Sequence, residues 1–143
     1  MTTEEAVGAP PVFLVSGCLL GLACRYDGRV KEYPDCRAAL AGKVYVPVCP
    51  EQLGGLPTPR EPADLAGGDG AAVLAGSARV VTRAGVDVTA HFVRGAEQVL
   101  RLARELRVAG VYLKSGSPSC GAGAVLGVTG ALLRREGFAI REF

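Results

Sequence analysis

Residues 12–18 read VFLVSGC, and this stretch decides the fold that the rest of the sequence predicts. Its apolar run is continuous rather than alternating, which is typical of a strand covered on both faces, and it ends at Gly17. Residues 44–48 (VYVPV) and 111–113 (VYL) repeat the pattern and predict two more buried strands. Pro47 cannot donate a ladder hydrogen bond, so the second strand is expected to lie at a sheet edge or to end there.

Helices are expected between these strands. Residues 34–41 begin with a proline and precede Gly42, a pattern that favours a short helix. The clearest helix is predicted to begin near Thr89 and to end before Gly110, because apolar side chains recur there every three or four positions. This apolar face consists of Phe92, Ala96, Val99, Ala103 and Leu106.

The end of the chain continues the same alternation. Residues 129–136 predict a last helix that stops at Gly137, and residues 138–140 predict a fourth strand. Strands that alternate with helices need crossover connections, which place the strands parallel to one another. The sequence therefore predicts an α/β fold: a single compact domain over residues 1–143, Rossmann-like, with a mainly parallel sheet flanked by helices.

Three other segments are expected to contribute less to the sheet. Residues 1–11 are predicted to be a flexible leader. Residues 53–70 are rich in glycine and proline and predict an ordered loop, biased towards extended backbone by its prolines. Residues 79–82 and 86–88 predict a small hairpin, because two short β-prone runs flank a turn.

The composition excludes several classes of protein. No run of 18 apolar residues could span a membrane. A net charge of +2 with 6% aromatic residues and no basic stripe argues against nucleic acid as a partner. The acidic start MTTEE lacks the features of a signal peptide, which predicts a cytoplasmic protein. The five cysteines are then expected to be metal ligands, catalytic thiols or buried residues rather than disulfides.

Three cysteines follow predicted strands. Cys18 lies two residues after the first strand, Cys49 directly follows the second, and Cys120 closes the loop after the third. The carboxyl ends of parallel strands share one edge, where ligands bind, so these thiols are expected to converge on a cavity. A metal centre would relieve the repulsion between three thiolates. Two metal centres are compatible with three thiolates at this point. One is a 4Fe–4S cluster in which one iron has no protein ligand, and the other is a zinc ion with three thiolates and water.

The other two cysteines are treated separately. Cys36 lies in the short Ala-rich helix and is predicted to be a buried apolar residue. For Cys24, a fourth thiol near the site and a buried structural residue are equally compatible with the sequence.

His91 is the only histidine and lies off the apolar face of its helix, which predicts a solvated surface residue. This placement argues against catalysis by a Ser-His-Asp or Cys-His arrangement.

Two polar residues flank the proposed cysteine site. Glu51 lies two residues after Cys49, where its carboxylate suits proton transfer, although a solvated loop carboxylate would have the same sequence. Ser117 lies three residues before Cys120, where its hydroxyl either donates to a substrate atom or closes a serine turn.

Several motifs resemble those of the 2-thiouracil desulfidase family, formerly described as a domain of unknown function. They are VSGCLLG at 15–21, CRYDG at 24–28, VCPEQLGGLP at 48–57, SPSCG at 117–121, GVDVT at 85–89 and LLRREG at 132–137. The resemblance covers nearly the whole chain and implies a compact α/β fold with a 4Fe–4S cluster on three cysteines. By motif, the ligands would be Cys18, Cys49 and Cys120, and the catalytic pair would be Glu51 and Ser117.

The resemblance also implies a reaction. The sulfur of a thiolated pyrimidine similar to 2-thiouracil would bind the open iron, which polarises the carbon–sulfur bond. Water would replace the sulfur, giving uracil and sulfide without electron transfer, and Glu51 would move protons while Ser117 orients the base. The expected partner is therefore a small thiolated base.

One departure from the family pattern leaves questions open. Only six residues separate Cys120 from Gly127, fewer than is usual in the family. This loop would border the open iron, so its shortness leaves the identity of the substrate open. It also leaves open a homodimer in which a partner chain covers the site. The alternative functions are a non-catalytic cluster or zinc-binding protein that senses or carries sulfur, and a zinc hydrolase.

Overall fold

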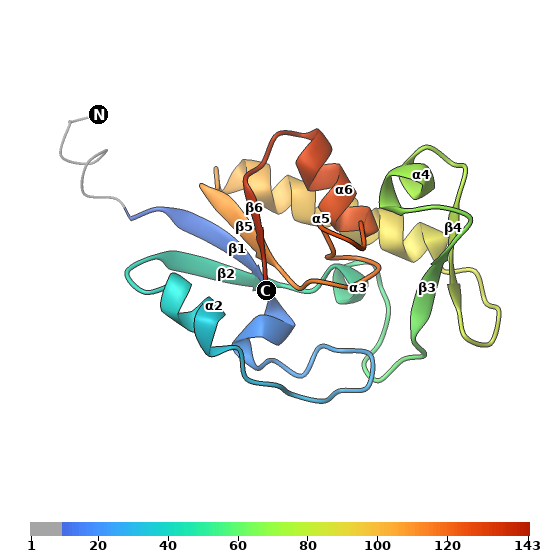
Figure 1. The fold of residues 1–143 in the computed structure, drawn as a ribbon, viewed down its shortest axis with the longest axis horizontal. Coiled ribbons are helices and arrows are strands. Elements are labelled where there is room, and N and C mark those ends of the chain that lie inside the picture. The colour runs from blue at the N-terminus through green and yellow to red at the C-terminus, as the bar shows by residue number, and fades with distance from the viewer. Residues whose placement is uncertain (1–9) are drawn as a thin grey trace.

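The computed structural model describes residues 10–143, whose centre is a four-stranded parallel sheet (Figure 1). The strands pair in the order β2-β1-β5-β6, and every pairing is parallel. Their bounds are Val12–Ser16 for β1, Val44–Val48 for β2, Gly110–Leu113 for β5 and Ile140–Glu142 for β6. The predicted α/β fold with a mainly parallel sheet is confirmed. Residues 1–9 of the predicted leader lie outside the described residues.

Two strand predictions need correction. β2 has the predicted bounds and lies at the sheet edge, as Pro47 indicated, but it is not buried. Val44 and Tyr45 are exposed because an edge strand has a neighbour on one side only and no helix covers this end fully. The last strand begins at Ile140, two residues later than predicted, because its partner β5 pairs Val111 with Ile140.

Successive side chains of the central strands point to opposite faces of the sheet. Leu14 of β1 and Val111 of β5 belong to one core cluster, whereas the adjacent Val15 and Tyr112 belong to the other. The larger cluster lies under α5 (Thr89–Glu105) and α6 (Val128–Arg135). The smaller cluster lies under α2 (Pro34–Ala39) and the 3-10 helix η1 (Gly17–Leu20). Both faces are therefore covered, as the continuous apolar runs predicted.

The long helix α5 begins at Thr89, as predicted, and four of its five predicted apolar positions are buried. Leu106 is the exception, with 39% of its surface exposed. The helix ends at Glu105, so Leu106 no longer follows the helical face that packs on the sheet.

A second, two-stranded sheet was only partly predicted. It pairs β3 (Ala63–Ala66) antiparallel with β4 (Arg79–Thr82), and α4 (Gly70–Leu74) connects them. The prediction of a loop over 53–70 is therefore wrong for β3. The predicted hairpin is confirmed in part. Val81 and Asp87 form an antiparallel bridge, which is flanked by backbone hydrogen bonds between Thr82 and Val86 and between Val88 and Val80. Residues 86–88 form no full strand, and β4 pairs mainly with β3.

One short helix, α3 (Pro50–Leu53), connects β2 to the second sheet and carries part of the candidate site. It packs directly on the backbone of α5, and two glycines make this approach possible. A Cβ atom at Gly95 would collide with the Pro50 carbonyl, and one at Gly54 would collide with the His91 carbonyl. The position of α3 therefore depends on the absence of side chains at this crossing.

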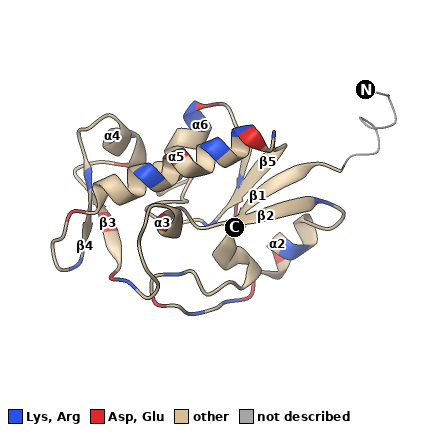
Figure 2. Cartoon of the chain, turned by 180° about the vertical axis from the view of Figure 1, so that it is seen from behind, with Lys and Arg blue, Asp and Glu red and all other residues tan. Residues whose placement is uncertain are grey.

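The charged residues do not gather into one surface. Lys and Arg are spread over α5, α2 and the loops (Figure 2). Among residues 10–143, no helix is both long enough and apolar enough to cross a membrane.

Candidate functional site

The three cysteines that follow the central strands line one cavity of about 330 Å³. Cys18 lies in η1 directly after β1, Cys49 is the residue between β2 and α3, and Cys120 lies in the loop after β5. The carboxyl ends of parallel strands therefore bring together side chains that are far apart in the sequence. This volume is within the range of roughly 300–1,000 Å³ that is usual for small-molecule sites.

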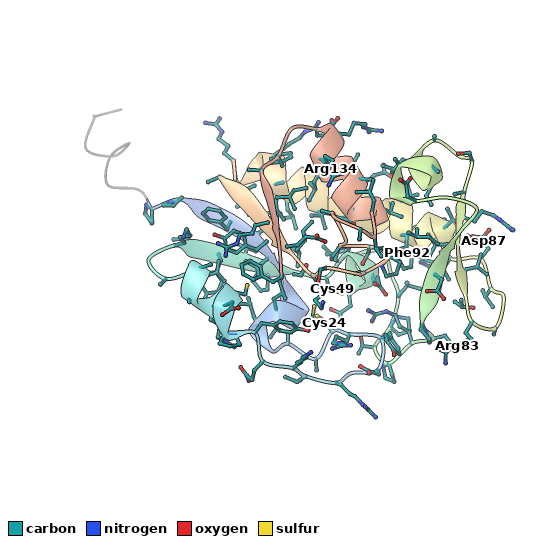
Figure 3. All side chains as sticks on the ribbon, viewed as in Figure 1. Cys24, Cys49, Arg83, Asp87, Phe92 and Arg134 are labelled. Atoms are coloured by element: carbon teal, nitrogen blue, oxygen red, sulfur yellow. The ribbon has the colours of Figure 1, made fainter. Side chains whose placement is uncertain are left out.

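Cys24, which the sequence left open, belongs to the same cavity. Its side chain is buried, and its thiol interacts with the thiols of Cys18 and Cys49 strongly enough to shift the pKa values of all three. The Cys49 thiol also lies 3.6 Å from the Cys24 carbonyl oxygen, to which it donates. Figure 3 shows Cys24 and Cys49 close together below the carboxyl end of the sheet. The structure thus places a fourth sulfur beside the three that the strand positions predicted.

The four thiols differ in how easily they lose a proton. The hydrogen bond from Cys24 lowers the pKa of Cys18, and Lys114 adds a smaller effect in the same direction. The pKa of Cys49 is raised well above its usual range, first by its hydrogen bond with Cys24 and then by burial. Burial raises the pKa of Cys120 to about 12. A metal that binds these sulfurs would therefore have to displace protons from most of them.

Glu51 lies in the first turn of α3, and its carboxylate is held on both oxygens. Arg60 Nε donates to Oε1 at 2.9 Å, and Ser119 Oγ donates to Oε2 at 2.9 Å. The Arg60 and Glu51 side chains are 6% and 16% exposed, so this ion pair is mostly shielded from water. All three residues line the cavity together with the cysteines. Glu51 is therefore a fixed carboxylate at the site and not a freely solvated loop residue.

Ser117 also lines the cavity, and its oxygen organises the turn that leads to Cys120. Its Oγ accepts the backbone N–H of Ser119 at 3.1 Å and that of Cys120 at 3.0 Å. The serine turn that the sequence allowed is thus present. Donation by Ser117 to a substrate atom stays a prediction.

Arg60 and Ser119 were missed by the sequence analysis. Arg60 lies in a segment that is notable in the sequence only for Pro57, Pro59 and Pro62, which gave no sign of a carboxylate partner. Ser119 lies between two residues that the analysis singled out, but nothing in the sequence indicates that it contacts Glu51, 68 positions away. Both contacts depend on how the loops fold over the sheet edge.

Two residues lie away from the cavity. Cys36 is fully buried in the smaller core cluster, as predicted. The prediction of a solvated His91 is wrong: the side chain is partly buried, and its Nδ1 is hydrogen-bonded to the Gly54 carbonyl oxygen at 2.8 Å. The close packing of α3 on α5 brings this carbonyl to the imidazole.

The cavity offers cysteine thiols as possible ligands of a metal centre. Within residues 10–143, no three His, Cys, Asp or Glu side chains are arranged around one point as the ligands of a single ion. An iron–sulfur cluster is held by cysteine thiolates on different irons, and four cysteines line this cavity.

Comparisons with known proteins agree with this fold. The sequence model of a family described as 2-thiouracil desulfurase matches residues 13–142. The Bacillus subtilis (strain 168) protein YbbK, described as uncharacterized, is 42% identical over 141 residues, which span 90% of this chain and 93% of YbbK. Among solved structures, the 4Fe–4S-dependent thiouracil desulfidase TudS is similar with a TM-score of 0.74 and 40% identity, covering 92% of this chain and 90% of TudS. The similarity includes all segments that line the cavity.

Proposed function

The chain belongs to the 2-thiouracil desulfurase family, whose name describes a carbon–sulfur bond-cleaving enzyme, and we propose that it removes sulfur from a thiolated pyrimidine similar to 2-thiouracil. The reaction is a substitution in which water supplies the oxygen of uracil and the sulfur leaves as sulfide, with no net electron transfer. One observation carries the proposal: the thiols of Cys18, Cys49 and Cys120 line the same cavity as the clamped carboxylate of Glu51.

The donor set fits a 4Fe–4S cluster held by Cys18, Cys49 and Cys120. Thiolates are the usual ligands of such clusters, and three of them leave one iron without a protein ligand. The solved relative TudS is named as 4Fe–4S-dependent, which supports the same cofactor here. When bound, the cluster would supply an iron with affinity for soft sulfur that acts as a Lewis acid on the thiocarbonyl group.

Glu51 would carry the proton transfers of the reaction. Its carboxylate lines the cavity in an ion pair with Arg60, where it can accept a proton from the attacking water. The same group can then return the proton to the ring nitrogen or to the departing sulfide. Its position on α3, next to Cys49, places it at the wall of the cavity that also holds the thiols.

Ser117 would orient the base. Its oxygen is fixed by two backbone N–H groups, so its place on the cavity wall is set before substrate binds. A polar group that is already fixed in place lowers the entropy cost of bringing the reactants into position. The loop around it, with Pro118, forms part of the cavity wall.

Anaerobic reconstitution with iron and sulfide tests the proposal. We expect a brown protein with about four irons per chain, as for one cubane cluster, that releases uracil and sulfide from 2-thiouracil in equal amounts. A matched reaction with uracil and added sulfide controls for exchange. A stable cluster without turnover on thiolated bases would support the alternative, a protein that senses or carries sulfur. A colourless protein with one zinc per chain would support a zinc enzyme.

A further inference from the structure

We propose that Arg60 and Ser119 are positioning residues of the reaction, each of which holds one of the two carboxylate oxygens of Glu51. The inference rests on the proposed role of Glu51 in proton transfer. Neither residue needs to touch the thiolated base, because both act through the carboxylate. We call this arrangement of Arg60, Glu51 and Ser119 the carboxylate clamp.

The clamp fixes the rotation of the Glu51 side chain. Arg60 Nε donates to Oε1 and Ser119 Oγ donates to Oε2, each at 2.9 Å. Hydrogen bonds with an ionised partner are stronger than neutral ones, and two bonds to different oxygens define the plane of the carboxylate. The lone pairs that remain free on Glu51 therefore point in set directions when a substrate arrives.

Arg60 is itself held in place by two segments of the chain, around Thr58 and at residues 24–26. Its Nη1 donates to Thr58 Oγ1 at 2.8 Å, and its Nη2 donates to the Cys24 carbonyl oxygen at 2.9 Å. Its backbone N–H donates to the Tyr26 carbonyl oxygen at 2.7 Å. An exposed ion pair contributes little because water screens it, but the Arg60 side chain is only 6% exposed. A lysine at this position has one charged nitrogen and cannot reproduce the planar set of bonds.

Ser119 has one proton to donate and three acceptors near it. Glu51 Oε2 lies at 2.9 Å, Ser117 Oγ at 3.0 Å and Cys120 Sγ at 3.8 Å. The carboxylate oxygen is the nearest acceptor and takes the proton. In the free protein the Ser117 hydroxyl then donates to Ser119 Oγ, and it must turn away from Ser119 to bond to a base.

The clamp thus links the two predicted catalytic residues. Glu51 and Ser117 have no direct hydrogen bond among the described contacts, but both bond to Ser119, which is 2% exposed. Loss of the Ser119 hydroxyl would free Oε2 of Glu51 and the hydroxyl of Ser117 together. We therefore expect the Ser119→Ala exchange to lower turnover without removing a group that contacts the base.

Kinetics of the reconstituted enzyme test the clamp. Arg60→Lys and Ser119→Ala should each lower kcat by about 10- to 100-fold, as expected for loss of a hydrogen bond to a charged group, while KM for 2-thiouracil stays within about 3-fold. Ser119→Thr, which keeps a hydroxyl, should recover part of the rate. Ser77→Ala is the matched control, because Ser77 is exposed and bonds only to the Ala72 carbonyl oxygen among the described residues. Unchanged kcat in both Arg60→Lys and Ser119→Ala would overturn the inference.

Chemical rescue separates positioning from folding. In Arg60→Ala, millimolar guanidinium should restore part of kcat, whereas the same concentration of sodium chloride should not. Iron content and thermal midpoint are measured on every variant. If the rate falls only in proportion to iron content or folded fraction, the two residues are structural and the inference is wrong.

A spectroscopic readout does not depend on activity. In the 15N-labelled chain without cluster, the Arg60 Nε–H signal should be protected from exchange and should shift in Glu51→Gln. An unprotected signal that is the same in both proteins would contradict the clamp. Failure of the proposed function looks different: the wild-type protein would carry its cluster and show the Arg60 signal, but would release no sulfide.

Discussion

The five cysteines lie in two regions of the molecule, and the residues that surround the thiol differ between these regions. In α2, Cys36 packs among Val15, Leu19 and Leu40 in the smaller core cluster. At the carboxyl edge of the sheet, the other four cysteines line one cavity together with serines and a mostly buried ion pair. A cysteine is therefore informative about chemistry only through its surroundings.

The difference arises from where each cysteine lies relative to the sheet. Cys36 lies inside a helix that covers a sheet face, where the neighbouring side chains are apolar. Cys18, Cys49 and Cys120 lie just beyond strand ends, where the backbone turns away and leaves a cavity. Because the strands are parallel, these turns all lie at the same edge of the sheet, and reactive side chains therefore come together there.

The largest effect is expected from exchanging the three proposed ligands. Cys18→Ser, Cys49→Ser and Cys120→Ser should each lose most of the iron and all measurable sulfide release, because a hydroxyl is a poor ligand for cluster iron. Iron analysis and absorption spectra after anaerobic reconstitution check this. A single variant that retains full iron and activity would show that its cysteine is not a ligand.

Glu51→Ala is expected to have the next largest effect. Removing the carboxylate should lower sulfide release by about 10²- to 10⁴-fold, the usual contribution of a general acid or base. The cluster colour and iron content should remain, because Glu51 is not a proposed ligand. Loss of the chromophore in this variant would refute the proton-transfer role.

The packing of α3 on α5 offers a test of how the site is held. In Gly95→Ala, the added methyl group meets the Pro50 carbonyl, and the overpacking should cost about 1–3 kcal/mol of unfolding free energy. Because α3 carries Glu51, the activity of the folded protein should fall as well. Denaturant unfolding and turnover measure the two effects, and Gln98→Ala on the exposed side of α5 is the control. Full activity in Gly95→Ala would show that the site tolerates movement of α3.

The smallest effects on the reaction should come from Cys24 and Cys36, which sharpen the comparison of the two regions. Cys24→Ala should retain iron, because the three other thiols remain, but should change the cluster spectrum, because a thiol that lines the same cavity and interacts with Cys18 and Cys49 is lost. Cys36→Ser should leave iron and turnover unchanged and should lower the unfolding free energy by roughly 1–3 kcal/mol, since it buries an unpaired hydroxyl. Identical spectra in Cys24→Ala and wild type would place Cys24 with Cys36 as a structural residue.

Local patterns in the sequence predicted much of the architecture. β1 and β2 have the predicted bounds, and α5 begins at the predicted residue. The edge position of β2 followed from Pro47 alone. The motifs also identified the family, which the match over residues 13–142 confirms. The second sheet was harder to predict, because β3 pairs with β4 across a gap in sequence and has no apolar run of its own.

The sequence by itself determined which residues could react: cysteines after three strands, a carboxylate beside one of them and a serine before another. These follow from residue type and from the common edge of a parallel sheet, which are local properties. Only the tertiary structure decided that Cys24 joins the other thiols and that Arg60 and Ser119 hold Glu51. These contacts join loops whose relative positions are set by packing around the sheet. No periodicity or spacing in the sequence predicts such contacts.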